Sequence, residues 1–301
     1  MIAALESAPQ DLLPPPTVVA RLARRENQLQ MLPAVAVDAM QLAKKPDCSI
    51  SQYATLIERD AKLTVDILKI ANSVVYCPPI PIVSLHQAVV RLGLRECQNL
   101  IFTACISSLM RRISLDQELI RIVLWQHSFK TALLAMSLNH TFRFGFEGEE
   151  FTAGLVHDLG RTLLAVVDCD QFSVVESLDF NESREQVVRE GIVVGTDHCR
   201  LGAWYAIQQQ LPPQIAEVIL WHHQPEMALE NPRLTALVSV ADHMANHLQR
   251  FNESVGYDPA SNPYLPTLAK FADPQFEKQF RKMAEPLMDL AQRDSLSMTP
   301  A

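Results

Sequence analysis

The chain has 301 residues, of which 48% are apolar or aromatic, and a formal net charge of −8. It is therefore long enough to bury a sizeable core, and it is not disordered by composition. Residues 1–125 hold 13 Lys and Arg against 11 Asp and Glu, whereas residues 126–301 hold 13 against 23. This acidic second half argues against a nucleic-acid partner, which needs a surface of clustered positive charge. A small phosphorylated ligand is not excluded, because a metal ion can supply positive charge locally.

Six cysteines occur without a CxxC pair or a regular spacing, which is typical of reduced, mostly buried thiols in a cytoplasmic protein. The first residues contain no basic region followed by an apolar run, so we expect no signal peptide. The longest apolar stretches fall far short of the roughly 18–20 residues that span a bilayer. The sequence therefore predicts a soluble cytoplasmic protein that has no membrane partner.

Proline, glycine and helical spacing divide the first half into predicted helices. Pro33 suits the first turn of a helix. Leu63, Ile67 and Ile70 recur at the spacing of a core-facing helical stripe. Helices are expected over 34–43, from Ser49 or Ser51 through Ile57, over 63–70, from Ser84 to Gly93, and over 98–110.

The second half continues the helical pattern, and no alternating strand pattern occurs in the sequence. The predicted class is therefore all-α, a multi-helix bundle. Pro286 should kink or divide the last helix, and residues 252–268 are expected to form a loop. Helices are expected over 117–140, 150–167, 182–192, 197–209, 212–223, 231–248 and 276–293.

Histidines are concentrated in the acidic half, where eight of the nine follow residue 120. Imidazole and carboxylate groups are the ligands that Zn, Fe, Mn and related ions prefer, and a two-metal site needs several of them to converge. Several of these histidines lie next to an aspartate or another histidine, in the pairs His157 and Asp158, Asp197 and His198, His222 and His223, and Asp242 and His243.

Helical spacing indicates that the side chains converge. His127 shares a predicted face with apolar residues, and His222 lies on the buried side of its helix. Asp242 is near the inward face, and Asp158 heads a face of small residues. Gly202, four residues after His198, would allow another helix or a ligand to approach closely.

Two interpretations remain open at this point. A single core-facing histidine is usually a hydrogen-bonded packing residue, and a single buried aspartate usually caps a helix or pairs with a cation. A cluster of unpaired buried carboxylates would be costly, and a shared divalent cation would offset that cost. The candidate metal ligands are His127, His157, Asp158, His198, His222, His223 and Asp242.

The segment 153–161, which contains His157 and Asp158, resembles the hallmark of the HD superfamily of metal-dependent phosphohydrolases. The order His127, His157, Asp158, Asp242 is similar to the basic ligand set of that superfamily. His198 and the pair His222 and His223 resemble the additional ligands of the HD-GYP branch, which hydrolyses cyclic di-GMP.

The first half resembles the HDOD domain, and the resemblance covers roughly residues 27–225. The resemblance implies an all-helical fold of HD-domain type in a bacterial protein of signal transduction. Together with the predicted helices, the resemblance divides the chain into an N-terminal lead over 1–26, an N-terminal helical subdomain over 27–115, an HD-like subdomain over 116–250, and a loop with a C-terminal helix over 251–301. The residues that carry it are Leu32 and Pro33, Asp60 to Leu63, Asn72, Ser73 and Tyr76, and Val83 to Leu85 leading to Leu92 and Gly93.

The chain also departs from the patterns it resembles. Ala61 stands where the HDOD family commonly has proline, and Val123 stands where some HD-GYP enzymes have a glutamate for a third metal. Arg161 replaces the lysine that follows the HD motif in HD-GYP enzymes, which keeps the charge but changes its geometry. The GYP segment is missing, since His223 runs directly through Pro225 towards the helix of Asp242.

Two functions follow from the resemblance. The first is a regulatory module with an HD-like site for one or two divalent transition-metal ions (Fe, Mn, Zn or Ni) that acts mainly through contacts with signalling proteins. The alternative is an active phosphohydrolase on a nucleotide or cyclic dinucleotide. In that alternative Asp158 bridges two cations and Arg161 neutralises a phosphate oxygen, so that both are catalytic. The missing GYP segment favours the regulatory function.

Overall fold

The computed structural model describes residues 13–24, 34–43, 45, 47–72, 78–112, 118–176, 178–180, 184–209 and 211–295. Within these ranges the chain is helical and contains no β-strand, which confirms the all-α class. No helix in this part of the chain is both long and apolar enough to cross a membrane. Leu32, Pro33, Ser73 and Tyr76, which contribute to the HDOD resemblance, lie outside the described residues.

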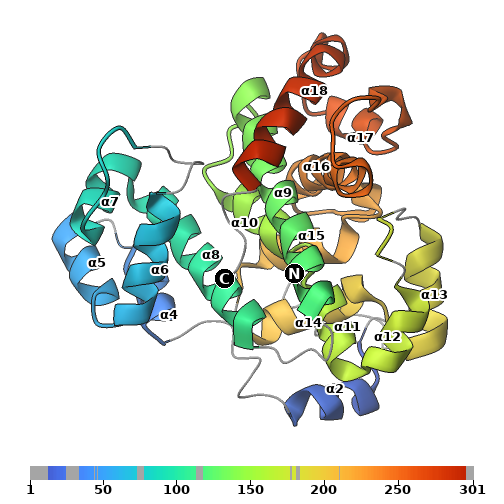
Figure 1. The fold of residues 1–301 in the computed structure, drawn as a ribbon, viewed down its shortest axis with the longest axis horizontal. Helices are drawn as coiled ribbons and strands as arrows, with labels where there is room; N and C mark the ends of the chain where they lie inside the picture. The colour runs from blue at the N-terminus through green and yellow to red at the C-terminus, as the bar shows by residue number, and fades with distance from the viewer. Residues whose placement is uncertain are drawn as a thin grey trace.

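The first group of helices comprises α4 (Ala34–Ala43), α5 (Ile50–Ile57), α6 (Ala61–Ala71), α7 (Leu85–Leu92) and α8 (Leu94–Arg112). Helices α4 to α7 lie to one side of the molecule, and α8 joins them to the remainder (Figure 1). Helix α8 packs against α4, α6 and α7 and also against α10.

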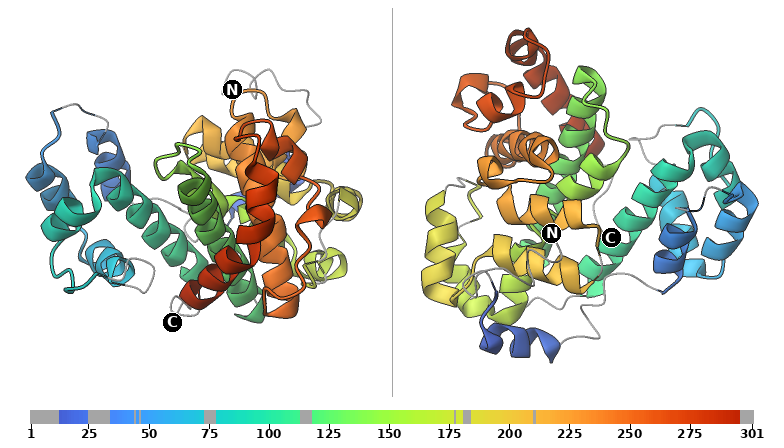
Figure 2. Two further views of the ribbon diagram at one scale, coloured as in Figure 1. Left: turned by 90° about the horizontal axis from the view of Figure 1, so that it is seen from above. Right: turned by 180° about the vertical axis from the view of Figure 1, so that it is seen from behind.

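The second group comprises α9 (Glu118–Phe142), α10 (Glu149–Val156), α11 (Leu159–Val167), α12 (Cys169–Val175), α13 (Arg184–Val194), α14 (His198–Gln208), α15 (Pro213–Trp221), α16 (Pro232–Phe251), α17 (Leu265–Ala269) and α18 (Phe276–Ser295), with the 3-10 helices η2 (Pro225–Met227) and η3 (Pro259–Ser261). Helix α9 is central and packs against α10, α16 and α18, an arrangement that can be followed in two further views (Figure 2). Helix α2 (Pro16–Ala23) packs against α11.

Side-chain hydrogen bonds explain where several helices begin. Ser49 caps α5 in a reciprocal capping box with Gln52, and the side chains of Asp60 and Ser84 cap α6 and α7. Such caps satisfy amide groups that have no partner within the helix. Gly93, at φ +89°, ends α7 in a conformation that side chains disfavour.

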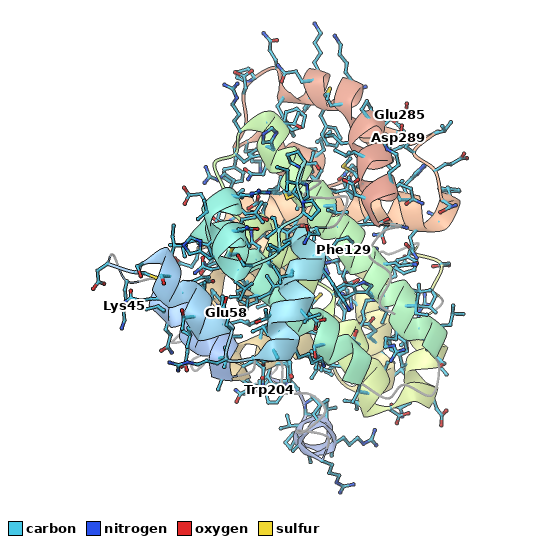
Figure 3. All side chains as sticks on the ribbon, turned by 60° about the vertical axis from the view of Figure 1, so that its left-hand side comes forward. Lys45, Glu58, Phe129, Trp204, Glu285 and Asp289 are labelled. Carbon is cyan, nitrogen blue, oxygen red and sulfur yellow. The ribbon has the colours of Figure 1, made fainter. Side chains whose placement is uncertain are left out.

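Apolar side chains fill most of the interior, and several charged side chains, including Asp158 and Arg161, are buried among them. Figure 3 shows Phe129 of α9 among the helices and Lys45 at the edge of the molecule, and Phe129 is only 2% exposed. The burial of apolar side chains follows from the free energy gained when apolar surface leaves water.

The expected single helix over 150–167 is wrong, because the chain turns at His157 and Asp158 and forms α10 and α11. The spacing of apolar residues does not reveal this break. Both helices are buried all round, so neither has an exposed face that would show where it begins or ends. The turn lets Gly160 pack against α14: a Cβ atom at Gly160 would lie 1.8 Å from the carbonyl oxygen of His198.

Two expectations for the C-terminal region also need correction. The segment 252–268 is not one continuous loop, since it contains η3 and α17. Of the kink or division expected at Pro286, the division is absent, since α18 continues through Pro286 to Ser295. Pro286 is exposed, and the opposite face of α18, which includes Phe280 and Met288, is buried. Packing of that face offsets the hydrogen bond that proline removes.

Candidate metal centre

The structure brings all seven predicted ligands together at the ends and along the sides of six helices. His127 lies on α9 and Asp242 on α16, whereas His157 and Asp158 form the turn between α10 and α11. His198 is the first residue of α14, and His222 and His223 directly follow α15. Each of the seven is at most 4% exposed.

Four of these residues form one half of the cluster around the Nε2 atom of His127. This atom lies 3.1 Å from Oδ1 of Asp242, 3.3 Å from Nε2 of His157 and 3.5 Å from Oδ2 of Asp158. The Nε2 atom of His157 lies 3.4 Å from Oδ1 of Asp242 and 3.6 Å from Oδ2 of Asp158. Two imidazoles and two carboxylates thus point to one place.

The second half of the cluster contains three histidines and the other oxygen of Asp158. The Nε2 atoms of His198 and His223 are 3.1 Å apart. Oδ1 of Asp158 lies 3.6 Å from Nε2 of His198 and 3.5 Å from Nε2 of His222. Asp158 therefore offers one carboxylate oxygen to each half, which is the position of a bridging ligand in a two-metal site.

The turn at Asp158 is held by a buried arginine. Arg161, fully buried, donates from Nη1 to Oδ2 of Asp158 at 2.8 Å. Its Nε and Nη2 atoms donate to Oε2 of Glu176 at 2.9 and 2.6 Å. The guanidinium is thus placed between two carboxylates, and this geometry favours a role in positioning Asp158.

Hydrogen bonds on the outer side of three imidazoles leave their inner nitrogens available. The Nδ1 atom of His157 lies 2.8 Å from the carbonyl of Gly154, and that of His222 lies 2.8 Å from the carbonyl of Ile219. The Nδ1 atom of His198 lies 2.7 Å from Oε2 of Glu190. These acceptors require a proton on Nδ1, which leaves the lone pair of Nε2 for a cation in the neutral ring.

The pKa shifts in the cluster favour a negatively charged Asp158 and neutral His127 and His222, which are the forms that bind a cation. Burial disfavours a charged Asp158, yet His157 and Arg161 outweigh it and hold the pKa of Asp158 well below its usual range. Burial also opposes protonation of His157, but Asp158 and Asp242 raise its pKa to about 9. Burial lowers the pKa of His127 and of His222, which favours the neutral form that binds metals.

Several polar atoms in the cluster lack hydrogen bonds within the described part of the chain. They include Oδ1 of Asp158, Nε2 of His222 and Oδ2 of Asp242. Buried polar atoms without partners are costly, and these three point towards the cluster or belong to its ligands. Two divalent cations would satisfy them, so the donor set fits the metal that the resemblance implies.

Two glycines, Gly160 and Gly202, allow the side chains of Asp158 and His198 to lie close together. A Cβ atom at Gly202 would lie 3.0 Å from the backbone nitrogen of Gly160, so both glycines allow α11 and α14 to approach. Asp197 caps α14 through its side chain and thereby fixes His198 at the first helical position. Ser239 of α16 donates to the carbonyl of His222, which joins the second half of the cluster to the helix of Asp242.

Sequence reasoning missed four residues around the cluster. Glu190 lies on a predicted helix and Glu176 lies between two of them, and neither carried a signal of spacing. Cys199 has a thiol within 4.8 Å of ligand atoms of His198, His222 and His223, and its position beside His198 was the available hint. Phe180, 3% exposed, has its ring centroid 4.9 Å from that of His127.

Comparisons with known proteins agree with the fold and the motifs. The sequence model of the HDOD domain matches residues 29–225, which include every candidate ligand except Asp242. The structure of an HDOD domain protein with unknown function from Geobacter sulfurreducens superimposes with a TM-score of 0.71 at 22% identity, covering 92% of this chain and 97% of that chain. A structure named "Putative phosphohydrolase" from Shewanella amazonensis SB2B gives a TM-score of 0.65 at 18% identity, covering 92% and 98%.

A curated relative extends beyond the region compared. An uncharacterized protein from Treponema pallidum (strain Nichols) is 25% identical over 275 residues, which cover 90% of this chain and 51% of the relative. The chain therefore spans about half the length of that protein. At the identities of the two solved structures, the likeness is one of fold.

Proposed function

We propose that this chain, which belongs to the HDOD domain family, is a regulatory module that holds two divalent metal ions and acts through contacts with signalling proteins. The match to the family supports a role in signalling, and the convergence of seven donor residues, with Asp158 between the two halves of the cluster, supports the metal site. Imidazole and carboxylate donors suit Fe, Mn, Zn or Ni.

We base the regulatory function on the burial of the cluster. All seven candidate ligands are at most 4% exposed, and the guanidinium of Arg161 is engaged by Asp158 and Glu176. Structural metal sites are closed by protein ligands, whereas catalytic sites keep a position open for water or substrate. The arrangement therefore favours metals that hold or report a conformation.

Hydrolysis of a phosphoester is the second candidate function. One observation favours it: Asp158 directs one oxygen to each half of the cluster, as a bridging carboxylate does in two-metal hydrolases. Bound divalent ions would supply Lewis-acid stabilisation of charge on phosphate oxygens. In this function Asp158 would hold the ions in place, and Arg161 would keep the Asp158 carboxylate oriented.

An activity assay with a metal-binding variant separates the two functions. The full chain, reconstituted in turn with Mn²⁺, Fe²⁺, Zn²⁺ and Ni²⁺, is assayed on bis(p-nitrophenyl) phosphate and on a cyclic dinucleotide. The regulatory function predicts the same background rate for the wild type and for Asp158→Asn. A wild-type rate at least about 100-fold above that of Asp158→Asn would establish hydrolysis instead.

The proposed contact with a signalling protein is tested with the wild type and Asp158→Asn. Each metal-reconstituted protein serves as bait in extracts of the source organism, and captured proteins are identified by mass spectrometry. We expect a partner that the wild type retains and Asp158→Asn loses. Identical capture by both proteins would contradict a metal-dependent regulatory contact.

A further inference from the structure

A group of exposed aliphatic side chains lies on α7 and on the segment 78–83 that precedes it. Ile80, Val83 and Val90 are 63%, 72% and 58% exposed. The guanidinium of Arg91, the neighbour of Val90, donates from Nη1 to the carbonyl of Ile80 at 2.6 Å, which holds the segment alongside α7. Large aliphatic side chains that are exposed together, rather than singly, mark a surface for association.

Further hydrogen bonds hold this segment in one conformation. The side-chain amide of Asn72, at the end of α6, donates to the carbonyl of Ile82 at 2.8 Å and accepts from the backbone amide of the same residue at 2.7 Å. The backbone amide of Val83 donates to Oε1 of Gln87 at 3.1 Å. Because these contacts fix the segment before a partner arrives, association costs little conformational entropy there.

The charge around these aliphatic side chains is positive. From residue 67 to residue 95 the sequence contains three Lys and Arg and no Asp or Glu. The acidic residues that flank this stretch, Asp66 and Glu96, are half-buried, whereas Lys69 and Arg91 are exposed. Lys69 lies three residues before Asn72, one helical turn away, and is therefore near the segment that Asn72 holds. We define the basic apolar surface as Lys69, Ile80, Val83, Val90 and Arg91.

A surface of opposite charge lies in the second group of helices, on η2 and the segment that joins it to α16. Met227 is 48% exposed and Leu229 is 84% exposed, and the two glutamates of this segment, Glu226 and Glu230, are also exposed. No Lys or Arg occurs from residue 201 to residue 232, and the guanidinium of Arg233 is stacked over an aromatic ring at 4.7 Å. We define the acidic apolar loop as Glu226, Met227, Leu229 and Glu230.

A buried carboxylate holds the acidic apolar loop in place. Glu217 of α15 is 4% exposed, and its Oε1 atom accepts from the backbone amides of Leu229 and Glu230 at 2.9 and 3.0 Å. Its Oε2 atom accepts from the backbone amide and from Nδ2 of Asn231 at 2.8 and 2.7 Å. The backbone of the loop is thus fixed while the Leu229 side chain remains in water, which is unfavourable unless another surface covers it.

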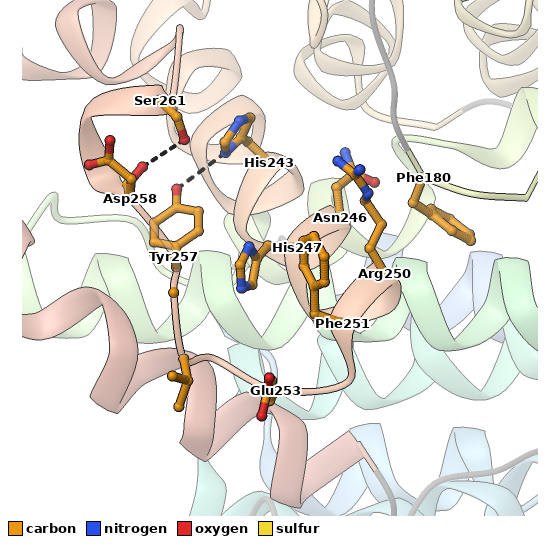
Figure 4. Close-up of a pocket in the computed structure, with 12 residues that line it drawn as sticks. Phe180, His243, Asn246, His247, Arg250, Phe251, Glu253, Tyr257, Asp258 and Ser261 are labelled. Atoms are coloured by element: carbon orange, nitrogen blue, oxygen red, sulfur yellow. Dashed lines mark hydrogen bonds between the residues drawn. The ribbon is translucent and has the colours of Figure 1, made fainter.

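A third exposed apolar site carries charges of both signs and therefore complements neither surface. Phe251 and Val255, at and beyond the end of α16, are 53% and 68% exposed. Figure 4 shows Phe251 with Arg250 beside it and Glu253 on the segment that follows, and the Arg250 guanidinium lies 5.1 Å from the centroid of the Phe251 ring. This site supplies control variants for the other two surfaces.

From these features we propose that the basic apolar surface of one copy of this chain binds the acidic apolar loop of a second copy. Both surfaces belong to the same chain, so a second copy always supplies the complement. The aliphatic side chains of the two surfaces pack together, and the glutamates of the loop face Lys69 and Arg91. Because the two surfaces differ, a dimer with two such contacts or a longer assembly forms. Neither surface contains a candidate metal ligand, so the association does not rest on the proposed function.

Sedimentation velocity of the full chain from about 2 to 200 µM tests this association. We expect self-association with a Kd of about 100 µM or below, weakened about fivefold or more when the NaCl concentration rises from about 50 to 500 mM. Val83→Ser and Leu229→Ser should each weaken the association by about tenfold or more. Both side chains are largely exposed, so these variants are expected to fold, and circular dichroism checks this.

An exchange of charge between the two surfaces tests whether they touch each other. Lys69→Glu and Glu230→Lys should each weaken self-association by about tenfold or more, because the two surfaces then repel. An equimolar mixture of the two variants should associate about as tightly as the wild type, since the reversed charges are opposite again. A misfolded variant could not produce this recovery, so a mixture that stayed as weak as its components would overturn the proposal.

Val255→Ser and Glu253→Lys are the matched controls, because both residues are exposed and belong to the third site. They should leave the Kd unchanged, and losses equal to those of Val83→Ser and Glu230→Lys would overturn the proposal. A wild type that stayed monomeric at every concentration would overturn it as well. Flotation of that monomer with phosphatidylglycerol vesicles would then assign the basic apolar surface to a membrane instead.

Discussion

The Nδ1 atom of His198 lies 2.7 Å from a buried carboxylate oxygen of Glu190, and the same oxygen accepts the backbone amide of His198 at 2.8 Å. This pair fixes the orientation of a candidate metal ligand from α13, a helix that contributes no ligand itself. Partners of this kind hold a metal-binding imidazole in the required tautomer.

Replacing Glu190 should therefore weaken metal binding without removing a ligand. We expect Glu190→Gln to reduce the affinity of the second half of the cluster by about 10–100-fold, measured by competition with a chromophoric chelator. Glu185→Gln, on the exposed side of the same helix, is the control and should match the wild type. Equal affinities for Glu190→Gln and the wild type would show that Glu190 does not support His198.

Removing the buried arginine should destabilise the metal-free protein strongly. Arg161→Met leaves Asp158 and Glu176 without their shared cation, and breaking a buried pair in this way costs about 3–5 kcal/mol. Denaturant unfolding monitored by circular dichroism measures the loss. The loss should shrink when metal is added, because bound cations compensate Asp158.

The exposed ion pair between Arg21 and Asp168, 3.0 Å long, provides the comparison for Arg161. Its side chains are 49% and 23% exposed, so Arg21→Ala should cost about 1 kcal/mol or less. If Arg161→Met cost no more than Arg21→Ala, the guanidinium would not be holding the turn at Asp158.

A methyl group at Gly160 should separate α11 from α14. The added Cβ atom would meet the carbonyl of His198 at 1.8 Å, so we expect Gly160→Ala to lower both the unfolding free energy and the metal content. Gly191→Ala is the control, since its Cβ atom would meet nothing within 4 Å on α13. That substitution should stabilise the protein by up to about 1 kcal/mol, and a similar gain for Gly160→Ala would contradict the described packing.

Metal affinity should rise with pH in the neutral range. The pKa of His157 is raised to about 9, so in the metal-free protein this ring carries a proton that must leave before it can bind a cation. Protons therefore compete with metal below about pH 9, and the apparent Kd for Mn²⁺ should fall about tenfold per unit between pH 6.5 and 8.5. His157→Ala should flatten this dependence for the first half of the cluster only, because the pKa of His198 in the second half is raised as well. A pH-independent Kd in the wild type would argue against His157 as a ligand.

Sequence patterns were sufficient for the features that local chemistry determines. The sequence placed the start of α5 at Ser49 or Ser51 and that of α7 at Ser84, and the structure has caps at Ser49 and Ser84. The end of α7 at Gly93 was also predicted. The HD motif and the HDOD resemblance identified the family, and all seven proposed ligands lie in one buried cluster.

Features that depend on tertiary packing were not accessible from the sequence. The break at His157 and Asp158 depends on the approach of Gly160 to His198, which is distant in the chain. Glu176 and Glu190 acquire their roles only because the fold brings them to Arg161 and His198. The uninterrupted course of α18 through Pro286 likewise depends on the buried face that packs on the bundle.

The metal content of purified, reconstituted protein tests the central claim most directly. Elemental analysis should find about two equivalents of divalent transition metal in the wild type. His127→Ala and His223→Ala, each altering one half of the cluster, should retain about one equivalent, and Asp158→Asn should retain almost none. Less than about a fifth of an equivalent in the wild type after reconstitution, or the same content in all four proteins, would contradict a two-metal site bridged by Asp158.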